Sequence, residues 1–419
     1  MKIALVNYHY FINGGPDRYF FNIYRALEHQ GHIVVPFCFD YAETFDTPYR
    51  SYFPTPITGP GPSLYDQQTH TVWNKITALS KLFHNTETDD KFRLLLKTEK
   101  PDLVYMIYLS STFLPTLIRI ARKEFDLPVV YRLSDFHMFC PAYLFCRDGA
   151  ICTECVDDLS ACVRHRCVKG SRLGSIARVA QIQYFRCRNH YNWVETFISP
   201  SQFMASFLKE HGFPSEKILA LPTFSEDLSL RDSCLSASTG ETILFLGNVS
   251  REKGIEVLLD AFAAMNSSLT LDIVGKCSQE YIDLLQSRIP AEKRDCVRFR
   301  GFLSEDALLT TMKAARYLVH PAIWYENMPN SIIEMMSLGK PILSTVIGSI
   351  PELVEHEGNG LLVTPGDVNA LAQAMTIMET SSQCDQYGAR SRTLYEKRHT
   401  EVQHLRSLEK LFEKLLDRR

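Results

Sequence analysis

The sequence predicts an α/β fold built from two doubly wound parallel sheets. Short segments rich in Val, Ile and Leu recur along the chain, and amphipathic stretches such as 256–265 separate them. Segments that are apolar at consecutive positions are typical of parallel strands buried on both faces. The expected strands lie at 3–8, 33–39, 103–109, 129–135, 196–201, 218–223, 242–247, 269–275, 297–302, 317–322, 341–345 and 360–366.

These strands are too many for one small sheet, and a length of 419 residues suits two or three domains. The stretch 222–240 is polar, turn-rich and without periodicity, so we expect the chain to divide there. The prediction is an N-terminal domain over 1–222, a C-terminal domain over 223–395 and a final helix over 396–419. Ligands of such sheets bind beyond the carboxyl ends of the strands, so a cleft between two facing sheets would hold the ligand.

The composition is that of a soluble globular protein, with 45% hydrophobic and 22% charged residues. A formal net charge of −3 does not point to nucleic acid. The first residues lack the apolar core of a signal peptide, and no segment is apolar for long enough to span a bilayer. We therefore expect a cytoplasmic chain whose 12 cysteines are reduced unless they bind metal.

The stretch "YENMPNSIIEMMSL" (325–338) follows an expected strand and leads from a loop into a helix. Free N–H groups at a helix start attract phosphate. Glu326 lies in the loop and Glu334 lies about one turn into the helix, so two carboxylates flank this niche and suit sugar and ribose hydroxyls. On these two residues alone, a solvated Glu326 and a Glu334 that interacts with the helix dipole explain the pattern equally well.

A second strand–loop–helix unit, "FLGNVSREKGIEVLL" (245–259), brings cations to the same kind of position. Arg251 and Lys253 stand where the loop enters the helix, and Gly254 permits close backbone approach. Such cations can reach a diphosphate. Taken alone, a Lys-Gly pair is more often a solvated turn.

In their order along the chain, these features resemble the C-terminal domain of the retaining glycosyltransferases of family 4, which have the GT-B fold. The order comprises FLG, EKG, Asp272 to Gly275, the F-x-G near 299–301, the E-x7-E of the two glutamates, and the stretches 339–345 and 348–367. The first half resembles the family more weakly, through its Gly-Gly loop and the stretch 129–141.

The resemblance implies that Glu334 holds the ribose of a nucleotide-sugar donor, that Glu326 holds the donor sugar, and that Lys253 neutralises the leaving diphosphate. It implies catalysis without a metal and, because no carboxylate is placed as a covalent nucleophile, attack from the leaving-group face. The remaining donor-site residues implied are Gly14, Gly15, Gly247, Asn248, Gly275, Asn327, Met328, Pro329, Asn330 and Ser331.

The chain departs from the family pattern twice. Asn248 stands where the family usually has Arg, and we expect Arg251 to supply that charge. Ser134 stands where the family has a His that contacts the donor sugar, which leaves Asp135 and His137 as acceptor-side candidates.

A cysteine-rich insert is expected over 140–170. The C-x2-C of Cys152 and Cys155, followed by Cys162 and Cys167, predicts a structural zinc site. Cys146 or His165 could replace one ligand, and reduced thiols or a disulfide are the alternatives.

Basic residues interleaved with aromatic ones over 163–195, and a second amphipathic stretch over 72–83, predict contact with an anionic membrane surface. A solvated helix face that packs its apolar side on the core explains these stretches equally well.

The leading hypothesis is a retaining glycosyltransferase that takes a sugar from a UDP-, GDP- or similar nucleotide donor. Its acceptor would be a glycan or lipid-linked glycan in cell-surface polysaccharide synthesis, at the inner face of the cytoplasmic membrane. The alternatives are a nucleotide-sugar epimerase and a catalytically silent sugar- or nucleotide-binding protein. The departures from the family pattern at Asn248 and Ser134 are the reason to retain the silent protein as an alternative. The presence of Lys253, Glu326 and Glu334 together argues against it.

Overall fold

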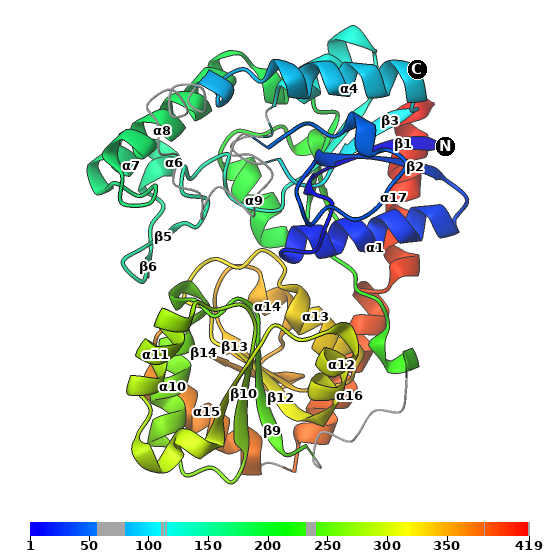
Figure 1. Ribbon diagram of the computed structural model, residues 1–419. Coiled ribbons are helices and arrows are strands. Elements are labelled where there is room, and N and C mark those ends of the chain that lie inside the picture. The colour runs from blue at the N-terminus through cyan, green and yellow to red at the C-terminus, as the bar shows by residue number, and fades with distance from the viewer. Residues whose placement is uncertain (57–79, 110–112, 114, 232–239, 381, 418–419) are drawn as a thin grey trace.

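The computed structural model describes residues 1–56, 80–109, 113, 115–231, 240–380 and 382–417. It contains two domains, one above the other in Figure 1, each built on a six-stranded sheet whose strands are all parallel. The predicted pair of doubly wound α/β domains is therefore confirmed. The first part of the predicted amphipathic stretch 72–83 lies outside the described residues.

The N-terminal sheet has the strand order β2-β1-β3-β4-β7-β8. Its strands are β1 (Lys2–His9), β2 (Ile33–Phe39), β3 (Leu103–Met106), β4 (Val129–Arg132), β7 (Thr196–Ser199) and β8 (Ile218–Ala220). Successive residues of β1 enter opposite layers: Ala4 and Val6 pack with α4 (Thr86–Glu99) and α9 (Gln202–Glu210), while Ile3 and Leu5 pack with α1 (Gly15–His29). Burial on both faces is the reason for the unbroken apolar run.

The C-terminal sheet has the order β11-β10-β9-β12-β13-β14. Its strands are β9 (Thr242–Leu246), β10 (Thr270–Val274), β11 (Val297–Gly301), β12 (Ala315–His320), β13 (Ile342–Thr345) and β14 (Gly360–Val363). One face packs on α10 (Ile255–Ala264), α11 (Gln279–Ser287) and α15 (Val368–Thr380). The other packs on α12 (Glu305–Ala314), α13 (Asn330–Ser337) and α16 (Cys384–Arg398).

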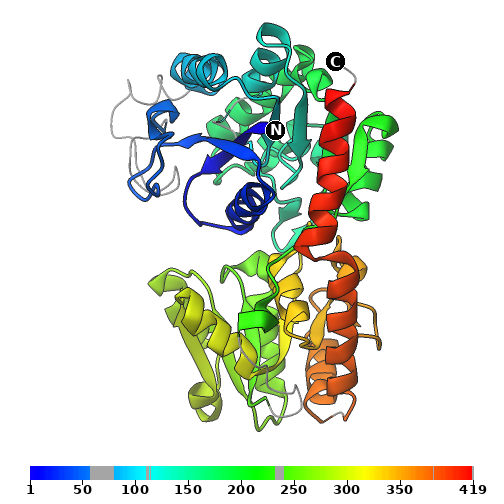
Figure 2. The same ribbon diagram turned by 90° about the vertical axis from the view of Figure 1, so that its right-hand side faces the viewer.

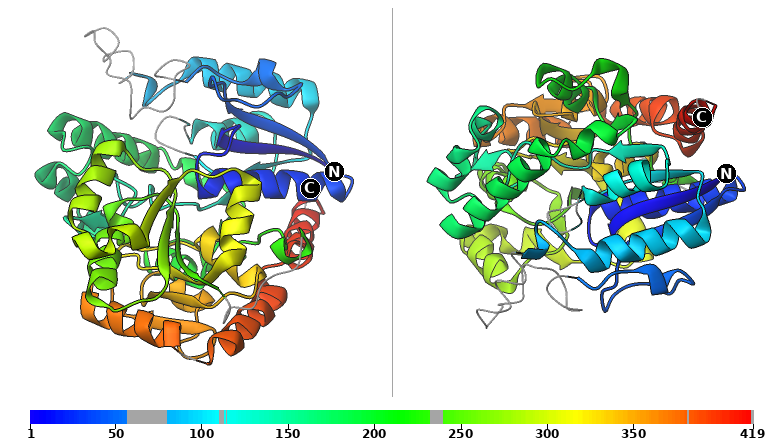
Figure 3. Two further views of the ribbon diagram at one scale, coloured as in Figure 1. Left: turned by 60° about the horizontal axis from the view of Figure 1, so that its bottom comes forward. Right: turned by 90° about the horizontal axis from the view of Figure 1, so that it is seen from above.

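Helix α17 (Glu401–Leu416) returns from the C-terminal domain to the N-terminal one, as Figure 2 shows. Leu405, Leu408 and Phe412 are buried in the same layer as α1 and Tyr105. His32 at the start of β2 contacts Glu409, with 3.0 Å between His32 Nε2 and Glu409 Oε1. Both views of Figure 3 accordingly place the two chain ends on one side of the molecule.

The cysteine-rich stretch forms a hairpin, β5 (Cys146–Arg147) and β6 (Ala150–Ile151), followed by α6 (Glu154–Asp157), α7 (Ser160–His165) and α8 (Arg172–Cys187). The hairpin projects towards the C-terminal domain (Figure 1). Among the described residues, no helix is both long and apolar enough to cross a membrane.

The two domains contact each other through several side chains. Glu352, in α14 (Ile350–Leu353), accepts hydrogen bonds from the backbone N–H groups of Gln202 and Phe203 at 2.8 and 2.7 Å. Tyr325 of the C-terminal domain packs into an aromatic cluster of the N-terminal domain, with 5.0 Å between its ring centroid and that of Phe203. Phe136 and Phe145 complete this cluster.

Candidate active site

The two loops that the sequence marks meet at one point of the C-terminal sheet. The strand order reverses between the adjacent strands β9 and β12, and ligands of doubly wound folds bind at the carboxyl ends of such a switch point. The loop after β9 carries the cations in the short helix η7 (Arg251–Lys253), and the loop after β12 carries Glu326. The fold therefore brings Lys253 to Glu326 although 72 residues separate them, since their positions differ by 73.

Glu326 is buried, and one of its carboxylate oxygens has three partners. Its Oε1 lies 2.5 Å from Lys253 Nζ, 2.7 Å from Trp324 Nε1 and 3.2 Å from His320 Nε2. Burial by itself would raise the pKa of this carboxyl group, but the charge of Lys253 and the hydrogen bond from His320 lower it well below the ordinary value. The site therefore holds a carboxylate and an ammonium group in direct contact.

The two loops are pressed together at a glycine. Gly254 has φ +75°, and a Cβ atom there would lie 1.8 Å from the carbonyl oxygen of Pro321 at the end of β12. Any side chain would push η7 away from the Glu326 loop. Gly275 is constrained similarly, since its Cβ would lie 1.7 Å from the oxygen of Gly247, so these two glycines serve the packing of neighbouring strand ends.

Glu334 lies in α13 with a side chain only 8% exposed, and its partner comes from the other domain. Arg18 Nη1, in the first turns of α1, donates to Glu334 Oε1 at 2.6 Å. The charge of Glu334 raises the pKa of the Arg18 guanidinium. Sequence reasoning missed Arg18, although it follows the Gly-Gly loop directly in "GGPDR".

The Gly-Gly loop itself reaches α13. The carbonyl oxygen of Gly15 accepts from Asn330 Nδ2 at 3.1 Å. Asp17 fixes the conformation of the loop, because its Oδ2 accepts hydrogen bonds from the backbone N–H groups of Asn13 and Gly14 at 3.2 and 3.0 Å. The loop thus contacts α13, and a donor-binding role for Gly14 and Gly15 stays a prediction.

The residues between the two glutamates make different contacts. The Asn327 amide spans the domains: its Oδ1 accepts from Ser201 Oγ at 3.0 Å and its Nδ2 donates to the oxygen of Leu133 at 3.0 Å. The Met328 side chain is buried in the core beside α13, with φ +66° at its backbone. Pro329 is the N-cap of α13, which begins at Asn330 and Ser331, so the helix start follows the Glu326 loop directly.

Arg251 is not directed to the Lys253–Glu326 pair. Its Nε lies 3.6 Å from the position that a Cβ on Gly149 would occupy, at the tip of the β5–β6 hairpin. The cation that was expected to replace the missing family arginine thus lies beside the cysteine-rich insert, where it is exposed. Asn248 lies exposed in the same loop.

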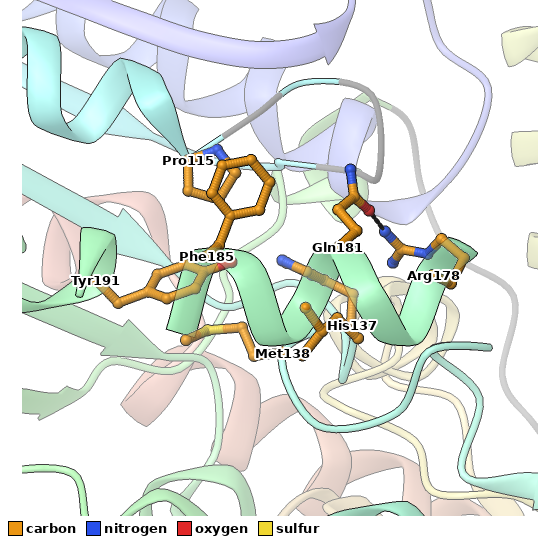
Figure 4. Close-up of a pocket in the computed structure, with 8 residues that line it drawn as sticks. Pro115, His137, Met138, Arg178, Gln181, Phe185 and Tyr191 are labelled. Carbon is orange, nitrogen blue, oxygen red and sulfur yellow. Dashed lines mark hydrogen bonds between the residues drawn. The ribbon is translucent and has the colours of Figure 1, made fainter. Parts of the chain in front are cut away.

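The acceptor-side candidates lie together in the N-terminal domain. His137 Nδ1 pairs with Asp135, and its Nε2 lies 3.2 Å from the Tyr131 hydroxyl. The imidazole lines a small cavity of about 20 Å³ with Arg178, Gln181, Phe185 and Tyr191 (Figure 4). This cavity lies beside α8, so the structure does not bring His137 to Lys253 and Glu326. An acceptor role for Asp135 and His137 stays a prediction.

Ser134, at the family histidine position, is tied to the ends of two strands. Its Oγ donates to the oxygen of Ile107 at 2.7 Å and accepts from Arg132 Nη1 at 2.8 Å. This hydroxyl holds β4 beside β3.

The predicted zinc ligands do not form a tetrahedral set. Among the described residues, no group of three or more His, Cys, Asp or Glu side chains could hold a metal ion. Cys155, Cys162 and Cys167 pack in one apolar cluster, whereas Cys152 Sγ lies 3.7 Å from Glu154 Oε1. His165 pairs with the same carboxylate, its Nε2 lying 3.1 Å from Glu154 Oε2. A structural zinc stays a prediction for this insert.

A pocket of about 370 Å³ opens at the carboxyl ends of β10 and β11. Val249, Gly275, Lys276, Phe299 and Phe302 contribute to its lining, and Phe302 is 64% exposed. An apolar slot of this kind beside Gly275 suits a flat nucleotide base. Gly275 and the F-x-G near 299–301 were the sequence signals for it.

Comparisons with known proteins agree with this geometry. Residues 14–223 match the family described as "Glycosyl transferase 4-like domain", and residues 240–379 match "Glycosyl transferases group 1". The two matches together place both domains in the glycosyltransferase class. The chain belongs to the glycosyltransferase family 4-like group.

Among curated relatives, an uncharacterized glycosyltransferase of Methanocaldococcus jannaschii is 28% identical over 154 residues, covering 36% of this chain and 38% of the relative. The amylovoran biosynthesis glycosyltransferase AmsK of Erwinia amylovora is 27% identical over 173 residues, covering 38% and 42%. The matches span less than half the length of these relatives.

Solved structures agree over nearly the whole chain. Anabaena HepE in complex with UDP and glucose has a TM-score of 0.64 at 17% identity, covering 99% of both chains. Sucrose-phosphate synthase of Thermosynechococcus elongatus has a TM-score of 0.70 at 18% identity, covering 100% of both. At this identity the likeness shows the fold, and the predicted GT-B fold is confirmed.

Proposed function

We propose that this protein transfers a sugar from a nucleoside-diphosphate sugar to a glycan or lipid-linked glycan in cell-surface polysaccharide synthesis, with retention of configuration. The observation that carries the proposal is the contact of Lys253 with buried Glu326 at the β9–β12 switch point. A buried ion pair is costly to keep, and its position at the ligand-binding edge argues for a chemical role.

The donor would lie across the C-terminal domain. Its base fits the pocket beside Lys276 and Phe302, its ribose hydroxyls fit Glu334, and its diphosphate fits the start of α13 near Lys253. The complexes of Anabaena HepE contain UDP and UDP-glucose, which supports uridine as the first base to test.

In the proposed reaction the bond between the anomeric carbon and the β-phosphate oxygen breaks, and the acceptor hydroxyl attacks from the same face. The acceptor proton passes to the departing phosphate oxygen, which balances the step. Lys253 and the N–H groups of α13 stabilise the charge that develops on the diphosphate, which is usually the largest catalytic contribution. Arg251 would add to this only by leaving the tip of the hairpin.

The acceptor side is supported by the names of relatives. AmsK is named for amylovoran biosynthesis, and a relative from Escherichia coli is named as a putative colanic acid biosynthesis glycosyltransferase. Helix α8 exposes Leu173 by 79% and Ile176 by 44% next to Arg172, an arrangement suited to an anionic membrane surface. We infer that α8 contacts the inner face of the cytoplasmic membrane.

A thermal-shift series with UDP, GDP, dTDP, ADP and their sugar conjugates tests the donor assignment, because a bound ligand raises the apparent stability. One nucleotide diphosphate and one of its sugars should raise the midpoint, and release of that nucleotide should then depend on acceptor. Binding without any transfer would favour the silent sugar- or nucleotide-binding protein. That alternative rests on the departures from the family pattern at Asn248 and Ser134. No binding at all would contradict the proposal.

A further inference from the structure

The N-terminal Gly-Gly loop contacts the C-terminal domain at candidate donor residues. Lys276 Nζ donates to Asn13 Oδ1 at 2.9 Å, Asn330 Nδ2 donates to Gly15 at 3.1 Å, and Arg18 donates to Glu334 at 2.6 Å. Lys276 lines the base pocket and Glu334 is the candidate ribose ligand. The loop therefore follows the path expected for the donor from its base to its phosphates.

Arg18 is firmly placed beside Glu334, the candidate ribose ligand. It follows Asp17, whose buried carboxylate accepts from backbone groups of the loop and from Asn7 Nδ2 at 2.9 Å. The Arg18 side chain is 34% exposed, while that of Glu334 is 8% exposed. A guanidinium has five N–H donors, and the contact with Glu334 engages Nη1.

The cations around the niche differ in how accessible they are to a diphosphate. Lys253 contacts Glu326 and Arg18 contacts Glu334, so neither pair brings net charge, but the Arg18 side chain is 34% exposed and that of Lys253 is 18% exposed. Arg251 lies against the hairpin at Gly149, and Asn248 is uncharged. Two cations lie on the other side of the niche: Lys276 at the base pocket, and Arg18 at the carboxylate that would bind the ribose.

We propose that Arg18 binds the donor diphosphate and that Glu334 positions it. This rests on the proposed function and extends it, because a binding residue for the leaving group then comes from the N-terminal domain. When ribose hydroxyls occupy part of the Glu334 carboxylate, the guanidinium keeps one N–H on that carboxylate and turns another to a phosphate oxygen. Arg is suited to such bridging because its donors are planar and diverge.

Calorimetry with a nucleoside and its diphosphate separates this role from others. UDP and uridine are the first pair, and GDP with guanosine is used if the wild type binds that base instead. Arg18→Gln should weaken diphosphate binding by about 10-fold or more, as expected for a lost charged hydrogen bond. Binding of the nucleoside, which has no phosphate, should stay within about 3-fold or become tighter, because Glu334 is released.

Two variants accompany the test. Arg18→Lys keeps the charge and should recover part of the diphosphate affinity. Arg25→Gln lies on the same helix, where Arg25 is exposed and contacts Phe21 and Asn22, and it should change neither affinity.

Equal effects of Arg18→Gln on nucleoside and diphosphate, in either direction, would overturn the proposal, because Arg18 would then be only a partner or competitor at Glu334. Unchanged diphosphate affinity would overturn it as well. A wild-type protein that binds none of the pairs would overturn the proposed function together with this inference, and so the two failures are distinguishable.

Discussion

Lys253 offers the sharpest test at the scale of single residues. In Lys253→Met, kcat should fall by about 100-fold or more, while the dissociation constant of the nucleoside diphosphate should rise by less than about 10-fold, because the charge matters most when the bond breaks. Single-turnover kinetics and calorimetry measure the two quantities. Lys397→Met, which removes an exposed lysine of α16, is the control. An equal loss in both quantities would contradict a role in leaving-group departure.

Glu334 gives a second residue-scale prediction. Glu334→Ala should weaken binding of the nucleoside, because the carboxylate is expected to hold the ribose. It should weaken binding of the diphosphate at least as much, because the carboxylate also positions Arg18. Calorimetry with uridine and UDP measures this. An unchanged uridine affinity would remove Glu334 from the ribose site.

The candidate residues differ in how far the sequence could place them. Lys253, Glu326 and Glu334 were predictable because each stands at a fixed offset from the end of a strand or the start of a helix. Arg18 was not, because its contact with Glu334 joins positions that differ by 316 and depends on how the domains dock. The contact of the hairpin with Arg251 and the cavity around His137 could not be predicted either. Both depend on the path of the insert, whose sequence has little periodicity.

At the scale of elements, the approach of η7 to the end of β12 predicts a large effect at Gly254. Gly254→Ala should lower the free energy of unfolding by about 2 kcal/mol or more, because the side chain meets the Pro321 carbonyl and also strains a positive φ. Gly31→Ala is a matched control, since Gly31 has φ +81° with nothing within 4 Å of its Cβ position. Gly31→Ala should lower the free energy of unfolding by about 1 kcal/mol. Urea denaturation measures both, and equal losses would show that the close approach is unimportant.

The cysteine-rich insert carries the second prediction at this scale. If a structural zinc holds α6 and α7, purified protein should contain about one zinc per chain, and a chelator should lower the thermal midpoint. Cys155→Ser should lose the metal, whereas Cys277→Ser, far from the insert in sequence, should keep it. If elemental analysis finds no zinc, the prediction of a structural zinc is wrong and the cysteines of the insert form a cluster of reduced thiols.

For the whole molecule, two buried histidines at the crossing to α17 predict a pH dependence. Burial lowers the pKa of His399 to about 4 and that of His404 to about 3. Their Nδ1 atoms lie 2.8 Å from the carbonyl oxygens of Thr223 and Pro222, which tie α17 to the N-terminal domain.

In the unfolded chain both groups titrate near pH 6.5, so below that pH the unfolded state binds protons that the folded state does not. The two histidines contribute their full share to the free energy of unfolding above pH 6.5. This share is lost as the pH falls towards 4, by about 1.4 kcal/mol for each histidine and pH unit. Urea unfolding at pH 7, 6 and 5 measures the slope, and His399→Gln should reduce it. A stability that stays constant over this range would contradict the prediction.

The packing of α17 against α1 also has a consequence for biosynthesis. A ribosome makes the N-terminal domain first, but Leu405, Leu408 and Phe412 become available only after the C-terminal domain has been made. Until then the nascent domain exposes the apolar layer that these side chains later cover. Chaperones that bind such surfaces would therefore be needed longest for the half of the protein that is synthesised earliest.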